Sequence, residues 1–351
     1  MLRSMYSGIS GMKSNQTKLD VIGNNIANVS TTGFKASSAR FTDMIYQSSK
    51  SATAPTSTKG GTNAAQVGLG AQIASINKVV SQGNALSTGR SLDACVDGDG
   101  YFIVAGGSTS FNTDDTAAEN KIQNGTISSD SSNQMFYTRD GNFTLDKDGN
   151  LLSSNGLRVM GYLYQDLNDT TVTSIGPDGA AYYVNPDAVD ANGESTLVAA
   201  GGGACLNTLR IPTEVILDND KTKTQPVVSF SISKDGLITA VLGNGSLTAL
   251  GQIATATFKN PEGLTDKGGN LAVVSANSGE PIVRTPKGKL ADGIIDNSDG
   301  FGDIVQGCLE ASNVDLTEQF TDMITATRAF QASSKMISTA DEILQTITSL
   351  M

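Results

Sequence analysis

Side chains that could carry out chemistry are few and scattered in this chain of 351 residues. Histidine is absent, which removes every Ser/His/Asp or Cys/His catalytic arrangement and most zinc sites. The segment 243–247 is not a nucleophile elbow, because its second flanking glycine is missing. A phosphate-binding G-x-x-x-x-G-K-[ST] loop does not occur either. The sequence gives no positive sign of an enzyme, and it predicts no cofactor.

Two weaker chemical signals have simpler interpretations. Residues 146–150 begin like a calcium loop, but glycine is fourth instead of sixth and Leu157 replaces the bidentate glutamate, so we predict a hairpin turn there. Cys95, Cys205 and Cys308 are far apart and odd in number, so they predict small buried hydrophobes and not a disulfide framework. A glycosidase with two carboxylates distant in sequence is the enzyme class that stays open.

Composition excludes several partners. The net charge is −11 with a pI near 4.5, and no cluster of Lys and Arg occurs, so we expect no nucleic-acid binding. No run of 18 apolar residues exists, so we expect no membrane insertion. The first residues lack the apolar region of a secretory signal peptide, so no cleaved signal is expected.

The elements that would position any site are helices at the two ends of the chain. Large apolar residues recur at every seventh position near the C-terminal end: Leu316, Met323, Phe330, Ile337, Leu344 and Met351. Mostly small residues follow three positions later: Ala326, Ser333, Ala340 and Ile347. This spacing predicts a helix of coiled-coil type within the end segment 308–351, with Asp315 and Glu318 capping its start. We also assign Phe320 to its assembly face.

The N-terminal end shows the same spacing less regularly. Apolar residues follow steps of three and four: Leu2, Met5, Ile9, Met12, Leu19 and Ile26, with Val21 and Ile22 widening the stripe. Gly8, Gly11 and Gly23 each cost a helix about 1 kcal/mol relative to alanine. We therefore expect the terminal segments to be largely disordered in the free monomer and to order only when packed.

Between the ends, turn signals alternate with strand patterns. Hairpin dipeptides occur at these positions: Asp97-Gly98, Asp99-Gly100, Asn124-Gly125, Asp140-Gly141, Asp148-Gly149, Asn155-Gly156, Asp178-Gly179, Asn192-Gly193, Asp235-Gly236 and Asn244-Gly245. They flank strand-like runs at 101–104, 143–145, 158–162, 227–232 and 253–258. The middle of the chain is therefore predicted to be antiparallel β structure.

These patterns predict an α+β fold, in which paired terminal helices enclose an antiparallel β body of one main domain with a small inserted region. Residues 48–66 are rich in Ser, Thr, Lys and Gly, which favours a flexible or extended connector. The predicted divisions are 1–70 for the first helix and connector, 71–165 and 226–307 for the two parts of the β domain, 166–225 for an insertion or small outer domain, and 308–351 for the last helix.

Paired end helices suggest self-association. If the two ends meet as antiparallel helices, the remaining apolar stripe on each faces neighbouring copies, and a self-complementary contact that does not close builds a helical polymer. The alternative is an ordinary two-helix clasp inside one monomer. Periodicity alone leaves both open.

Longer motifs add a resemblance. The run 19–35, from Leu19 through Asn24, Asn25, Ile26 and Asn28 to Gly33 and Phe34, closely resembles the N-terminal signature of flagellar rod and hook axial proteins. The run 309–316, followed by 323–324 and 328–331, resembles the matching C-terminal signature. Segments 41–44, 89–104, 136–143 and 250–264 also match, so the resemblance covers about 1–105, 136–165 and 226–351.

The resemblance implies a structural subunit of a bacterial flagellar tube, whose terminal helices form the inner wall and whose β domains lie outside. It implies export by the type III apparatus, location in the hook or basal body outside the cell, and no enzymatic activity. Implied partners are further copies of the chain and the rod, hook-cap and hook–filament junction proteins. The extra segment 166–225 favours a hook subunit that transmits torque; the distal rod is the alternative. The 24–28 amides are expected to cap the helix end.

Overall fold

The computed structural model describes residues 2–57, 59–106, 122–123, 126–127, 134–166, 169–176, 180–187, 195–200, 205–217, 223–290 and 295–350. The chain forms two compact units. Unit 1 comprises Met1–Ser30, Lys35–Ser81 and Asn313–Met351, and unit 2 comprises Thr31–Phe34 and Gln82–Ser312.

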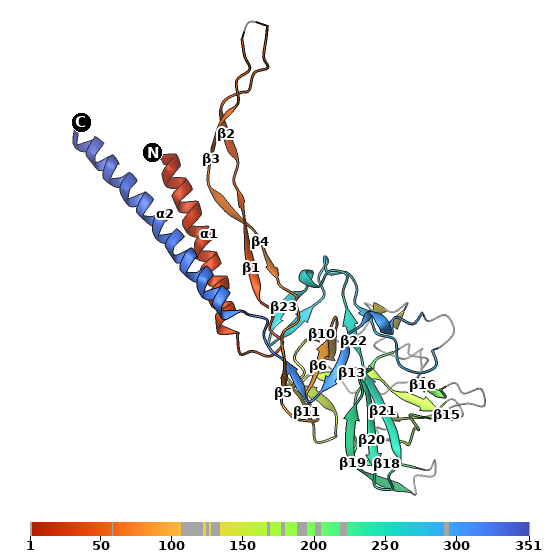
Figure 1. Ribbon diagram of the computed structural model, residues 1–351. Coiled ribbons are helices and arrows are strands. Elements are labelled where there is room, and N and C mark those ends of the chain that lie inside the picture. The colour runs from red at the N-terminus through yellow and green to blue at the C-terminus, as the bar shows by residue number, and fades with distance from the viewer. Residues whose placement is uncertain are drawn as a thin grey trace. The chain divides into compact units, whose positions relative to one another are not determined.

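Two helices dominate unit 1. Helix α1 (Leu2–Ala27) and helix α2 (Leu316–Leu350) lie side by side (Figure 1). They run antiparallel, because Asn25 contacts Gln319 while Gly8 lies against Ile337. The carboxylate of Asp315 accepts hydrogen bonds from the backbone N–H groups of Thr317 and Glu318, which confirms the predicted N-cap.

A long two-part hairpin, here called the arm, completes unit 1 (Figure 1). Strand β1 (Ser37–Asp43) pairs with β4 (Ala71–Lys78), and β2 (Tyr46–Lys50) pairs with β3 (Ala65–Gly68). The segment predicted as a flexible or extended connector therefore contains paired strands. All residues of β2 and β3 are exposed, so no burial pattern revealed them.

The described part of unit 2 forms mainly short strands, with the 3-10 turns η2 and η3 among them. Their bounds are β5 (Ala85–Ser87), β6 (Ala94–Asp97), β7 (Tyr101–Ala105), β8 (Ile122–Gln123), β9 (Thr126–Ile127), β10 (Met135–Thr138), β11 (Phe143–Leu145), β12 (Leu151–Ser153), β13 (Arg158–Tyr162), β14 (Tyr164–Asp166), β15 (Asp169–Thr173), β16 (Leu197–Ala199), β17 (Asn207–Thr208), β18 (Glu214–Ile216), β19 (Thr224–Ile232), β20 (Leu237–Leu242), β21 (Leu247–Ile253), β22 (Thr255–Thr257), η2 (Pro261–Gly263), β23 (Thr265–Gly268), β24 (Leu271–Val273), β25 (Ile282–Val283), η3 (Ser298–Gly300), β26 (Asp303–Gln306) and β27 (Cys308–Glu310).

Most of these strands belong to one sixteen-stranded sheet, whose central path runs β18-β19-β20-β21-β13-β7-β22-β25-β9-β8. Its ladders are antiparallel. A three-stranded sheet of β15-β14-β16 and the two pairs β26-β6 and β27-β5 complete the unit. The predicted terminal helices and antiparallel β body are thus confirmed, while a coiled-coil supercoil of the helices stays a prediction. The range 308–351 assigned to the last helix is wrong at its start, because 308–310 form β27 in the β body and α2 begins at Leu316.

The core of unit 2 has two main apolar clusters on opposite faces of β7. Phe102 and Val104 belong to one cluster, and Ile103 and Ala105 belong to the other. Because successive side chains of a strand point to opposite faces, a strand covered on both sides must be apolar throughout. This explains the continuous apolar run at 101–105.

The predicted hairpin dipeptides differ in what they connect. Asp148-Gly149, Asn155-Gly156, Asp235-Gly236 and Asn244-Gly245 join strands that pair with each other, so the hairpins are confirmed, including the one that resembled a calcium loop. Asp97-Gly98, Asp99-Gly100 and Asp140-Gly141 instead join strands that pair elsewhere. Asn124-Gly125, Asp178-Gly179 and Asn192-Gly193 lie outside the described residues.

The range 166–225 packs with the β body where it is described. Strand β17 pairs with β13, and β18 pairs with β19. Leu209 and Val215 lie in the same core cluster as Phe102. Likewise, β4, which we had assigned to the β domain, pairs with β1 in unit 1. The run 253–258 is divided between β21 and β22.

Candidate functional site

The contact between α1 and α2 uses the predicted heptad residues of α2. Met323, Phe330, Ile337 and Leu344 are half-buried. The small residues Ala326 and Ala340, predicted to allow close approach, are buried. We call this row of large and small residues on α2 the seam.

Glycines of α1 make the close approach possible. A Cβ added at Gly8 would lie 3.2 Å from Cγ1 of Ile337, and one at Gly11 would lie 3.2 Å from Oγ of Ser333. These glycines weaken an isolated helix but allow its backbone to approach the seam. The sequence analysis treated them only as a cost, so their packing role was missed.

The predicted residues of α1 are distributed unevenly. Ile22 is buried, and Ile9 is exposed. The half-buried members are Met5, Met12, Leu19 and Ile26. The side chain of Leu2 lies outside the described part of the structure, as does Met351.

Three predicted assembly residues of α2 remain exposed beside the seam. These are Leu316, Phe320 and Ile347. They therefore contribute little to the α1–α2 contact. Their exposure leaves them available for another surface.

A second apolar row on α2 was missed by the sequence analysis. Met336, Ile343 and Leu350 are 46%, 49% and 81% exposed. They recur every seven residues, one position before the last seam residues, so the signal was present in the sequence. We call these three residues the outer stripe. Helix α2 continues well past the start of α1, so its last turn has little of α1 beside it (Figure 1).

The amide side chains at the end of α1 bond within unit 1, as predicted. Asn28 Nδ2 donates to the carbonyl oxygen of Asn24 at 2.9 Å. Asn25 is fully buried; it donates to the Ser37 carbonyl at 2.8 Å and to Oε1 of Gln319 at 3.0 Å. The run thus fixes the start of the arm against the ends of both helices. Any role of these amides between subunits stays a prediction.

Gly33 of the N-terminal motif lies in unit 2. Its N–H donates to the Glu310 carbonyl at 2.8 Å, and its φ is +67°. A Cβ there would lie 2.9 Å from the backbone of Arg139 and Asp140. Only glycine fits this conformation and this spacing. Phe34 beside it is half-buried.

The carboxylate of Glu310 belongs to a buried ion pair. Arg139 Nη1 lies 3.4 Å from Glu310 Oε2, and the side chains are 3% and 2% exposed. Gly83 N–H donates to the other carboxylate oxygen at 2.9 Å. The guanidinium of Arg139 also lies 5.0 Å from the ring centroid of Tyr101. This pair connects the motif segment, β10 and β27 inside unit 2.

The arm carries a further set of exposed apolar side chains. Ile45, at its bend between β1 and β2, is 80% exposed. The others are Phe41, Met44, Tyr46, Val67, Ile76 and Val79. This many large exposed apolar side chains on one element favours a role in protein–protein contact.

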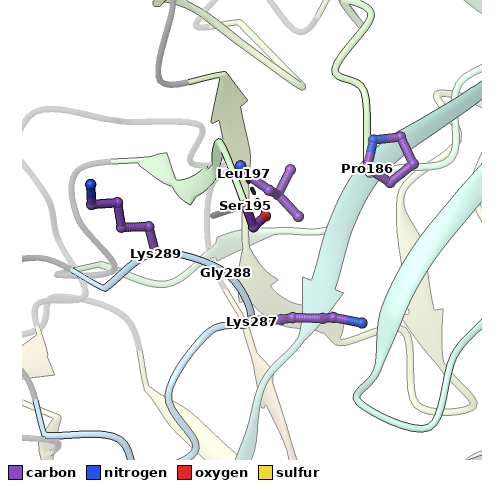
Figure 2. A pocket seen from close by; sticks show the side chains of 6 residues that line it. All are labelled: Pro186, Ser195, Leu197, Lys287, Gly288 and Lys289. Carbon is purple, nitrogen blue, oxygen red and sulfur yellow. Dashed lines mark hydrogen bonds between the residues drawn. The ribbon is translucent and has the colours of Figure 1, made fainter. Parts of the chain in front are cut away.

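A cavity of about 400 Å³ in unit 2 is the other candidate site (Figure 2). Pro186, Ser195, Leu197 and the run 287–289 line it. Lys287 and Lys289 extend in opposite directions from Gly288, and Lys287 Nζ forms a 3.1 Å ion pair with Asp235. The two ammonium groups therefore do not converge on one ligand.

The described residues also lack two other features. They contain no group of three or more His, Cys, Asp or Glu side chains able to hold a metal ion. None of the helices in that part of the chain has the length and apolarity needed to cross a membrane.

Three family models match the chain. "Flagella basal body rod protein" matches residues 5–35, "Flagellar hook protein FlgE/F/G D1 domain" matches 126–240, and "Flagellar basal body rod FlgEFG protein C-terminal" matches 305–350. The second match spans 166–225, for which the sequence motifs suggested no relative. The first and third contain the two terminal signatures and both helices of the seam contact.

Full-length sequences of flagellar proteins are also similar to this chain. The chain is 39% identical over 350 residues to the Bacillus subtilis flagellar basal-body rod protein FlgG, covering 100% of this chain and 99% of the relative. It is 29% identical over 475 residues to the Borreliella burgdorferi flagellar hook protein FlgE, covering 100% of both. It is also 26% identical over 452 residues to the Salmonella typhimurium hook protein FlgE, covering 99% and 100%.

The fold, the motifs and these matches define a structural protein of the bacterial flagellum. The chain belongs to the family of flagellar hook and basal-body rod proteins.

Proposed function

We propose that this chain is a subunit of the flagellar hook that polymerises with copies of itself into a tube. One observation carries the proposal: unit 1 presents apolar surface without a core of its own. All three apolar core clusters lie in unit 2. Among the described residues of unit 1, the buried apolar ones are Ile22, Ala36, Ala326 and Ala340.

The size of this surface favours association. Burying an isoleucine or leucine completely contributes about 1.5–3 kcal/mol. The outer stripe retains roughly half or more of that potential at each residue. Leu316, Phe320, Ile324 and the arm add to it. Copies that cover these side chains would supply the core that unit 1 lacks, and a contact that does not close produces a helical polymer.

The distal rod is the second candidate, and different observations favour the two. The relative named as a rod protein has the higher identity, 39%, against 29% for the Borreliella hook protein. The hook is favoured by the 166–225 range, which contributes strands β15 to β18. Coverage does not separate the two candidates, because the rod relative is covered over 99% of its length and the hook relatives over 100%. We place the hook first.

The proposal carries further expectations. The partners are copies of the chain and the neighbouring rod, hook-cap and hook–filament junction proteins. The chain reaches its place outside the cell by type III export. Its role is mechanical and not catalytic; the divergent lysines of the 400 Å³ cavity agree with this.

Polymerisation of purified chain tests the interface. Ile343→Asp places a charge in the outer stripe, and we expect loss of sedimenting polymer and of tubes in electron micrographs. Ser338→Asp is the matched control, because Ser338 is exposed and lies five residues before Ile343, on a different side of α2 from the outer stripe. It should polymerise like the unchanged chain. Far-UV circular dichroism should be the same for both variants. Normal tubes from Ile343→Asp would contradict the proposed interface.

A deletion strain separates the two candidates. Basal bodies with complete rods and no hooks would support the hook. Truncated rods would support the distal rod and remove the hook from consideration.

A further inference from the structure

Two of the three cysteines come together at the last strands of unit 2. Cys95 lies on β6 and Cys308 on β27. In the antiparallel pair β26-β6, Cys95 is opposite Val305. Cys308 follows Val305 by three residues. The two residues are therefore neighbours in space although they lie far apart in the sequence.

The backbone brings Cys308 back toward β6. Gly307 N–H donates to the Asp93 carbonyl at 2.7 Å, so the chain stays against the β6 segment to that point. Gly307 has a φ of +78°, a conformation that favours glycine, and it turns the chain from β26 into β27. Strand β27 also contacts β6. This turn brings Cys308 close enough to Cys95 to raise the pKa of the Cys95 thiol.

The two thiols differ in their access to solvent. Cys95 is buried, whereas Cys308 is partly exposed. The pKa of the Cys95 thiol is raised to about 11, mainly by burial and in part by the neighbouring Cys308, Glu310 and Asp97. An oxidant from solution therefore meets Cys308 first, and Cys95 is the slower partner.

We propose that Cys95 and Cys308 form an intramolecular disulfide when the folded chain meets an oxidising low-molecular-weight disulfide. The Cys308 thiolate attacks one sulfur of that disulfide and releases one small thiol. The Cys95 thiol then loses its proton to water and attacks the Cys308 sulfur, which releases the second small thiol. Two protein thiols are oxidised, and one small disulfide is reduced to two thiols.

The link would join β6 to the last strand of the unit. It would close most of the β body into one covalent loop. A disulfide that closes a long loop lowers the conformational entropy of the unfolded chain more than one that closes a short loop. It would hold β26 and β27 in place under mechanical load. This inference concerns unit 2 alone and holds for a hook or a rod subunit.

Cys205 provides an internal control. It is buried, and its sulfur accepts a hydrogen bond from Asn207 Nδ2 at 3.8 Å. It lies near Tyr162 on β13. It should keep its thiol while the other two are oxidised.

The test uses the purified full-length chain with glutathione disulfide, followed by alkylation in denaturant and mass spectrometry. We expect loss of two of the three alkylatable thiols, no retained glutathione, and a peptide linking Cys95 to Cys308. Its rate of formation should rise as pH increases toward the Cys95 pKa of about 11. Cys95→Ala should instead retain glutathione on Cys308, and Cys205→Ser should behave like the unchanged chain.

Three results would overturn the inference. They are glutathione held on Cys308 of the unchanged chain without a link to Cys95, a link that involves Cys205 or a second copy, and three free thiols after exposure that modifies a surface cysteine control. The unchanged chain alone decides among these, so the outcome does not depend on whether a variant folds.

Discussion

The two units of this chain use apolar side chains in opposite ways. In unit 2, residues such as Phe102, Phe143 and Val159 are completely buried in continuous clusters. In unit 1, side chains of the same kinds stay exposed on α2 and on the arm. A β body with its own core can fold alone, whereas helices and an arm without one need other surfaces. The division of the chain is therefore also a division between folding and assembly.

Polar groups follow the same division. The Arg139–Glu310 pair in unit 2 is almost completely buried. The Lys18–Asp322 pair in unit 1 joins α1 to α2 at 3.1 Å, but its side chains are 24% and 43% exposed. A buried pair fixes one arrangement because separating its charges is costly, while an exposed pair is readily replaced by water. Unit 1 is thus the part that can be rearranged at small cost.

The largest expected effect comes from the core of unit 2. Phe102→Ala removes a fully buried ring that contacts Phe143 edge-to-face at 5.1 Å between centroids. It should lower the free energy of unfolding by about 3–5 kcal/mol. Ile343→Asp in unit 1 should change it by less than about 0.5 kcal/mol, because the side chain is on the surface of the free chain.

Urea unfolding followed by tyrosine fluorescence and circular dichroism measures both, since the chain has eight tyrosines and no tryptophan. Equal destabilisation by the two variants would show that unit 1 has a core of its own in the monomer. The comparison between the units would then fail.

A smaller effect is expected from the ion pairs. Glu310→Gln leaves the buried Arg139 charge without its partner and should cost about 3 kcal/mol of unfolding free energy. Asp322→Asn breaks the exposed pair in unit 1 and should cost less than about 1 kcal/mol. Urea unfolding measures the free energy of unfolding of each variant. The double variant Arg139→Met with Glu310→Gln should recover part of the free energy lost in Glu310→Gln. If Asp322→Asn cost as much as Glu310→Gln, the contact between the helices would be far more rigid than its exposure indicates.

The sequence predicted the parts of the fold that have a local signal. The seventh-residue repeat from Leu316 to Leu344 predicted α2, and dipeptides such as Asp148-Gly149 predicted the hairpins between neighbouring strands. The apolar run 101–104 predicted a strand, and it lies in β7. Each of these signals depends only on residues close together in the chain.

The missing parts depend on distant residues or have no burial pattern. Strands β2 and β3 expose every residue, so no alternation distinguished them from a connector. Strand β17 has two residues, and its partner β13 is remote in sequence. At the candidate site, Gln319 is placed by its contact with Asn25, and Gly8 by Ile337, and neither contact can be predicted without the helix register. The outer stripe was predictable from the seven-residue spacing of Met336, Ile343 and Leu350, which the sequence analysis missed.

The smallest expected effect distinguishes the free chain from the assembled one. Gly23 of α1 has no atom within 4 Å of an added Cβ, whereas a Cβ at Gly8 would lie 3.2 Å from Ile337. Alanine at either position should raise helix stability by about 1 kcal/mol where α1 is isolated. Where α1 packs on α2, Gly8→Ala must also move Ile337, so part of its gain is lost.

Circular dichroism of the dilute monomer and the dissociation temperature of the polymer measure the two situations. We expect both variants to increase monomer helicity equally if, as the sequence predicts, the terminal segments order only on packing. In the polymer we expect Gly23→Ala to raise the dissociation temperature more than Gly8→Ala. If the two variants already differed in helicity as monomers, α1 and α2 would pack against each other before assembly. If the two variants instead raised the dissociation temperature of the polymer equally, α1 would not lie close to Ile337 at Gly8 in the assembled state.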